Sequence, residues 1–165
     1  MTASEFREHL CAKLKAAGSR VLLRVVVGGA VEEVVEFTGE TLLKRARELA
    51  SQYRQRAGSR VVLLLLPHSP ELFLLHLGLV LEGACPAILP WPTSRMDTEK
   101  YYRNLVHQLR ELPAGGLITA PSLAEGLGRL LPYPVASQTI TGANYLDLRV
   151  PEGIQVSDEP AAEPV

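Results

Sequence analysis

The sequence predicts an α/β fold: a mostly parallel sheet with helices on both faces, preceded by an N-terminal helix and a β-hairpin. Residues 61–66 form an unbroken apolar run of strand length. Ser69, Pro70 and Gly83 then mark the cap, the first turn and the end of a helix. Residues 85–89 return as a second apolar strand. A buried strand, a helix and another strand in this order predict a βαβ unit of a parallel sheet.

The start of the chain predicts the leading helix and the hairpin. Thr2 and Glu5 have the spacing of a capping box, and Gly18 can end the helix. Residues 21–27 and 31–37 are rich in β-branched side chains, and two glycines followed by an alanine join them. Such a connection is typical of a β-hairpin.

A second helix is predicted between Thr38, which can cap it, and Gly58, which can end it. Its apolar side chains recur at helical spacing and would form one buried stripe. They are Leu42, Leu43, Ala46, Leu49, Ala50 and Tyr53.

The second half of the chain continues the alternation of helices and strands. Asp97 can cap a helix, and residues 116–120 have the pattern of a short strand. Ser122 and Glu125 have capping-box spacing and predict that Ser122 begins the next helix. Two more strands are predicted, at residues 135–141 and 145–150.

These elements place one α/β subdomain at residues 1–150, in which residues 1–38 are the leading helix and hairpin. Residues 151–165 contain three prolines, four acidic side chains and few large apolar ones. That composition predicts a linker or a disordered tail.

Composition excludes several classes of function. Hydrophobic residues make up 47% of the chain, and 17 basic residues face 18 acidic ones. Without a basic patch we expect no nucleic-acid partner. The longest apolar stretch, residues 72–81, is too short to span a membrane. The two cysteines, Cys11 and Cys85, show no CxxC spacing, which favours a reducing, cytoplasmic location.

Several short motifs, in order, resemble the opening of AMP-forming acyl ligases. These enzymes are acyl-CoA synthetases, fatty acyl-AMP ligases and adenylation domains of peptide synthetases. The matching steps are Phe-Thr at 37–38, Gly-Ser-Arg-Val at 58–61, Pro-His-Ser at 67–69, Gly-Ala at 83–84 and Pro90. The resemblance covers about residues 36–120 and implies that the chain is the first subdomain of an adenylating-enzyme fold.

The resemblance implies that a complete enzyme would use ATP and Mg²⁺ to convert a carboxylic acid to an acyl-adenylate. The acyl group would then pass to CoA or to an acyl carrier protein. The family's phosphate loop, rich in Ser, Thr and Gly and ending in Pro-Lys-Gly, is absent; the nearest string, residues 139–142, has no lysine.

We therefore expect an N-terminal fragment that is catalytically incomplete alone, has no catalytic, cofactor-binding or metal-binding residue, and has the remaining ligase subdomains as partners. One alternative is a stand-alone interaction module of the same fold, docking onto a synthase or carrier protein without catalysis. A third possibility is an unrelated α/β domain.

Three residues are candidates for substrate binding. His68 and Ser69 follow one predicted parallel strand and Trp91 follows the next, and open α/β sheets bind ligands at the carboxyl ends of such strands. Each also has a structural interpretation: Ser69 caps a helix, His68 forms a turn and Trp91 packs against apolar neighbours. Cys85, in an apolar strand, is expected to be an inert buried thiol.

Overall fold

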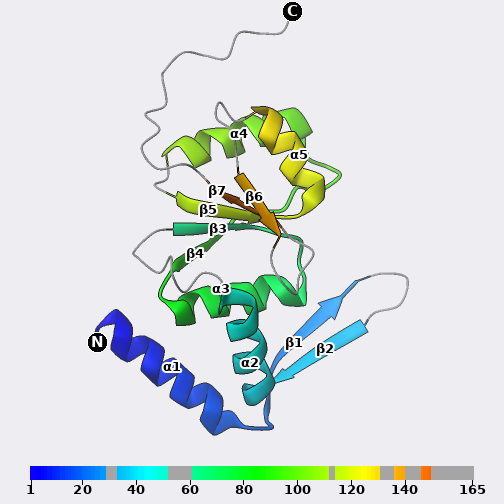
Figure 1. Cartoon of the computed structure of the whole chain (residues 1–165). Coiled ribbons are helices and arrows are strands. Elements are labelled where there is room, and N and C mark those ends of the chain that lie inside the picture. The colour runs from blue at the N-terminus through cyan, green and yellow to red at the C-terminus, as the bar shows by residue number, and fades with distance from the viewer. Residues whose placement is uncertain (29–32, 52–60, 112–113, 131–135, 140–145, 150–165) are drawn as a thin grey trace, which may run out of the picture.

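A computed structural model of the chain describes residues 1–28, 33–51, 61–111, 114–130, 136–139 and 146–149 (Figure 1). The helices are α1 Ala3–Ala17, α2 Gly39–Ala50, α3 Pro70–Glu82, α4 Thr98–Glu111 and α5 Pro121–Leu130. The strands are β1 Val21–Val27, β2 Glu33–Thr38, β3 Val61–Leu65, β4 Cys85–Ile88, β5 Ala114–Thr119, β6 Ala136–Thr139 and β7 Leu146–Arg149.

The strands form two sheets. β1 and β2 pair as an antiparallel hairpin, and the other five strands form a sheet in the order β4-β3-β5-β7-β6. Within that sheet β4, β3 and β5 are parallel, whereas β7 is antiparallel to β5 and β6 is antiparallel to β7. The predicted α/β class and the parallel βαβ unit are confirmed. The last two strands, β6 and β7, extend the sheet beyond β5 as an antiparallel pair.

Helices cover both faces of the five-stranded sheet (Figure 1). β3 lies between β4 and β5, and its neighbouring residues Leu63 and Leu64 are both fully buried because they point to opposite faces. On one face α3 packs against the sheet, and α2 packs on α3. On the other face lie α4 and α5.

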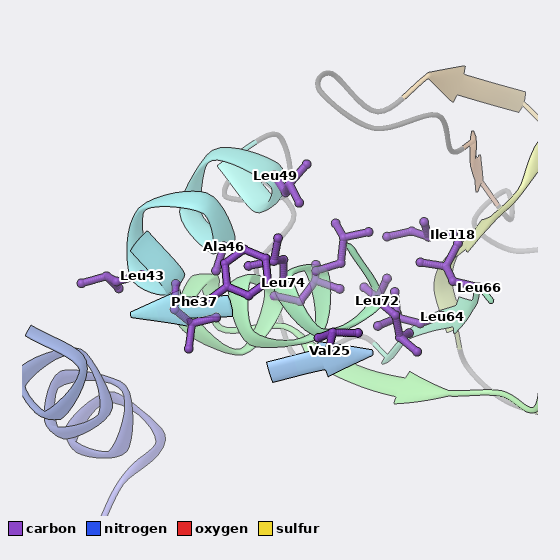
Figure 2. Close-up of a cluster of buried hydrophobic side chains, with 14 of the residues drawn as sticks. Val25, Phe37, Leu43, Ala46, Leu49, Leu64, Leu66, Leu72, Leu74 and Ile118 are labelled. Atoms are coloured by element: carbon purple, nitrogen blue, oxygen red, sulfur yellow. The ribbon is translucent and has the colours of Figure 1, made fainter. Parts of the chain in front are cut away.

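Two apolar clusters result. The first cluster contains the buried residues Leu14, Val25, Phe37, Leu42, Leu43, Ala46, Leu49, Val62, Leu64, Leu66, Leu72, Leu74, Leu75, Leu79 and Ile118. The second cluster contains the buried residues Leu63, Leu65, Leu105, Val106, Leu117, Leu123 and Leu127. Figure 2 shows Val25 and Phe37 of the hairpin reaching into the first cluster beside side chains of α2 and α3.

Close contact between helices depends on a glycine in the first cluster. A Cβ added to Gly78 of α3 would overlap the carbonyl oxygen of Ala46 and lie 2.7 Å from the Cβ of Ala50, both on α2. The two helix backbones can therefore approach only because position 78 has no side chain.

The helix boundaries follow the predicted caps at most positions. Thr2 and Thr38 form capping boxes, and Gly83 ends α3 with a left-handed φ of 88°. The predicted role of Ser122 is wrong: α5 begins at Pro121, and the N–H groups of Leu123 and Ala124 bond to the carbonyl oxygen of Ala120. The reason is that proline favours the first helical position, which places Ser122 inside the helix.

Some predictions fall on residues that the structure does not describe. The predicted helix end at Gly58 lies outside the described residues, while α2 itself is described to Ala50. Residues 151–165 also lie outside them, so the linker or tail and the domain boundary at residue 150 stay predictions.

Candidate functional site

The carboxyl ends of β3, β4 and β5 lie along one edge of the sheet, because the three strands are parallel neighbours. α3 leaves β3 on one face, and α5 follows β5 on the other face. Adjacent strands whose following helices diverge in this way form a topological switch point, where open α/β sheets place their ligands. This edge, formed by the carboxyl ends of the three parallel strands, is the candidate site and is called the sheet edge below.

Ser69 sits at this edge as the N-cap of α3. Its backbone is extended (φ −151°, ψ 161°), and its Oγ accepts a hydrogen bond of 3.4 Å from the backbone N–H of Leu72. Pro70 occupies the first helical position, which lacks an N–H in any case. The structural interpretation of Ser69 as a helix cap is confirmed, and its role in substrate binding stays a prediction.

His68 is exposed at the same turn. Its ring meets the ring of Phe73 edge-on, with ring centroids 5.3 Å apart and planes at 84°. The contact holds the imidazole against the first turn of α3 and leaves part of it in solvent. Its role in substrate binding stays a prediction.

Trp91 approaches the edge from the other face. It is half-buried and packs against the second cluster, with Tyr101 and Tyr102 of α4 in the same group. The Tyr101 hydroxyl donates a hydrogen bond of 2.8 Å to the carbonyl oxygen of Pro90, which holds the loop in place. The sheet edge thus brings the turn at His68 and Ser69 and the loop at Trp91 to one end of the fold, on opposite faces.

The environment of Tyr101 widens the pH range over which its hydroxyl stays protonated. Burial, with a smaller contribution from Tyr102, raises the pKa of Tyr101 to about 12. The hydroxyl therefore stays neutral, and able to donate its hydrogen bond to the carbonyl oxygen of Pro90, up to a higher pH than an ordinary tyrosine hydroxyl. Sequence reasoning missed this contact because the two residues are joined only by tertiary packing.

Thr119 was also missed. Its side chain is fully buried at the carboxyl end of β5, beside Leu65 of β3. Among the described residues, its Oγ1 is the one buried side-chain oxygen or nitrogen without a hydrogen-bond partner. Leaving a buried hydroxyl unpaired costs about 1–3 kcal/mol. The sequence signal that could have identified Thr119 is a single polar residue at the end of an apolar strand, shortly before a helix.

Two other titratable residues lie outside the site. The expectation of a buried Cys85 is wrong: the residue is exposed because β4 is an edge strand and Cys85 is its first residue. His76 lies within α3, where burial lowers its pKa.

Across the described part of the chain, no group of three or more His, Cys, Asp or Glu side chains could hold a metal ion. The sequence also lacks the glycine-rich, lysine-containing loop that would hold phosphates. No helix within the described ranges combines the length and apolar character needed to cross a membrane.

Solved structures with a similar arrangement include an acyl-CoA synthetase, an adenylation domain and a fatty acid AMP ligase. An acyl-CoA synthetase from Brucella canis matches 78% of this chain at 22% identity with a TM-score of 0.58, and the match covers 22% of that protein. The adenylation domain of a keto acid-selecting NRPS module matches 74% at 18% identity (TM-score 0.52), over 22% of its own length. A fatty acid AMP ligase from Legionella pneumophila matches 73% at 14% identity (TM-score 0.52), over 20% of its own length.

No sequence model of a protein family matches the chain, and no curated protein sequence matches it. The chain spans about a fifth of the length of these three solved structures. The shared architecture confirms the predicted resemblance at the level of fold. The chain has the fold of the N-terminal part of the adenylate-forming enzymes, a group that includes acyl-CoA synthetases, fatty acid AMP ligases and adenylation domains.

Proposed function

We propose that this chain is the N-terminal fragment of an AMP-forming carboxylic acid ligase. The complete enzyme activates an acid with ATP as an acyl-adenylate and transfers the acyl group to CoA or to a carrier protein in the cytoplasm. The observation that carries this proposal is the match of about three quarters of the chain to a fifth of several such enzymes.

In this proposal the fragment supplies a wall of the acid-binding cleft and no catalytic group. His68 and Ser69 form one side of the sheet edge, and Trp91 forms the other with a flat apolar surface. The remaining subdomains supply the groups that hold Mg²⁺–ATP, since this sequence has no glycine-rich, lysine-containing phosphate loop.

Acid-dependent exchange of labelled pyrophosphate into ATP tests the proposal. The assay compares the purified chain with the chain joined to the polypeptide encoded immediately after Val165. We expect exchange above background only in the joined protein, with acids drawn from fatty and aromatic panels. Exchange catalysed by the 165-residue chain alone would contradict the proposal, as would a joined protein that is inactive with every acid.

Trp91→Ala in the joined protein tests the role of the sheet edge. If Trp91 lines the acid pocket, the substitution changes the ratio of kcat/KM between a long and a short acid by about tenfold. Met96→Ala is the matched control, because Met96 is an exposed apolar residue of the same loop. An unchanged ratio in Trp91→Ala would assign Trp91 to packing alone.

A second candidate function is a non-catalytic interaction module of the same fold. The exposed apolar residues of the hairpin favour it, since monomers rarely leave such residues grouped on one element. The exchange assay separates the two candidates, because an interaction module has no activity in either form.

A further inference from the structure

The hairpin carries an unusual share of the exposed apolar surface. Eight large hydrophobic residues are exposed in the described part of the chain, and four of them lie on β1 (Val21, Leu22, Val26) and β2 (Val34). Val26 is 47% exposed and Val34 52% exposed. In Figure 1 the hairpin extends from the side of α2.

The strand register orders this outer face into two pairs. Val26 lies opposite Val34, and Arg24 lies opposite Glu36, so an apolar pair is followed by an oppositely charged pair. The Arg24 Nε and the Glu36 Oε1 are 2.6 Å apart, and the two side chains are 67% and 45% exposed. The inner face is different, since Val25 and Phe37 are buried in the first cluster.

This outer face is complementary to itself. Two copies can meet outer face to outer face around a two-fold axis that runs parallel to the strands and lies midway between the copies. Rotation about this axis stacks β1 of one copy on β2 of the other in the same register. The rotation places Arg24 against Glu36 of the second copy and Val26 against Val34 of the second copy. Both the charges and the apolar side chains match, as an isologous interface requires.

We propose that the outer face of the β1–β2 hairpin is a self-association surface that binds a second copy of this chain through stacked hairpins. Among the described residues the hairpin is packed on one face only, and an isolated two-stranded sheet is marginal in water. This inference goes beyond the proposed function and does not depend on it.

The size of the face sets the strength of the dimer. A seven-residue strand is about 23 Å long, and two strands are about 10 Å wide, so each copy contributes on the order of 230 Å² of contact. A standard interface buries about 800 Å² per partner. We therefore expect weak association, with a Kd on the order of 100 µM.

Sedimentation velocity of the full chain from 5 µM to 1 mM tests the proposal. We expect a monomer at the low end and a growing dimer fraction at the high end. Val34→Lys should weaken the dimer at least tenfold, whereas Ile88→Lys should leave it unchanged, because Ile88 is equally exposed on the distant edge strand β4. Circular dichroism confirms that each variant is folded.

A mixing experiment identifies the contact itself. Arg24→Glu gives a chain with two acidic groups at this pair, and Glu36→Arg gives a chain with two basic groups. Each variant alone should stay monomeric through repulsion, and an equal mixture should form a 1:1 heterodimer. A wild-type chain that is monomeric at 1 mM, or charge variants that associate alone as the wild type does, would overturn the proposal.

Discussion

The two faces of the five-stranded sheet are covered in different ways. Fifteen described residues form the first cluster, which continues through α3 into α2 and the hairpin. Seven form the second cluster, under α4 and α5, and the half-buried Trp91, Tyr101 and Tyr102 pack at its margin. The unpaired hydroxyl of Thr119 lies at the end of β5, where the strand meets α5.

This difference separates an apolar face from a face that also carries polar groups. The first face is apolar and so tightly packed that one helix contact requires a glycine. The second face contains polar and aromatic groups that apolar packing alone does not require, at the edge where ligands bind open sheets. Local departures from apolar packing are expected at functional sites.

Replacing adjacent leucines of β3 tests the comparison with the largest effects. Leu64→Ala should lower the free energy of unfolding by about 4 kcal/mol and Leu63→Ala by about 3 kcal/mol. Both side chains are fully buried, but Leu64 lies in the larger cluster, with fifteen described buried residues against seven, so we expect its cavity to be filled less by neighbouring side chains. Urea unfolding measures both. A larger loss for Leu63→Ala would contradict this ranking of the two clusters.

Gly78→Ala tests the contact between α2 and α3. The added methyl would overlap a backbone carbonyl, so we expect a loss of about 3 kcal/mol. Gly28→Ala is the matched control, because a Cβ there meets nothing within 4 Å. Thermal unfolding compares the two variants. Equal melting temperatures would mean that the helices are not in close contact.

Ser69→Ala should cost about 1 kcal/mol, because it removes the cap of α3. Ser122→Ala should cost nothing measurable, because Ser122 lies inside α5 and is exposed. Chemical denaturation gives both values. A comparable loss in Ser122→Ala would mean that Ser122 does cap the helix, as its sequence spacing predicts.

Thr119→Val should stabilise the fold by about 1 kcal/mol, because it replaces an unpaired buried hydroxyl with a methyl group of similar shape. Denaturation midpoints of the wild type and the variant provide the comparison. A destabilised Thr119→Val protein would show that the hydroxyl has a partner in solution.

The smallest expected effect is the alkaline pH dependence that Tyr101 introduces. Its pKa in the folded protein, about 12, lies above the ordinary value of 10.0, so the unfolded chain loses this proton first. The stabilisation is fully present below pH 10 and is lost as the pH rises toward 12. Tyr101→Phe should make the fall in stability between pH 10 and 11.5 shallower, as measured by urea unfolding. Identical slopes would contradict the assigned environment.

Much of the fold follows from local sequence signals. Thr2, Thr38, Ser69 and Asp97 each cap the helix that the sequence predicts, since capping depends on residues three positions apart. The apolar run before Pro67 predicts a strand that is buried on both faces, as observed. Ser122 shows the limit of such local signals. Its capping-box spacing conflicts with the preference of the adjacent Pro121 for the first position of a helix, where the structure places it.

The site was less predictable because it depends on distant contacts. The sequence places His68, Ser69 and Trp91 after strands, but not on opposite faces of the sheet. Cys85 is exposed because β4 is an edge strand, which its own residues do not specify. The contact from Tyr101 to Pro90 and the unpaired Thr119 likewise arise only when α4 and β5 come together with the rest of the fold.

The central proposal is that this chain is the N-terminal fragment of an adenylating enzyme and that the remaining subdomains hold the nucleotide. Isothermal titration calorimetry of the purified chain with ATP and Mg²⁺ tests it most directly. We expect no binding heat up to millimolar nucleotide. Saturable binding with a micromolar Kd would contradict the account.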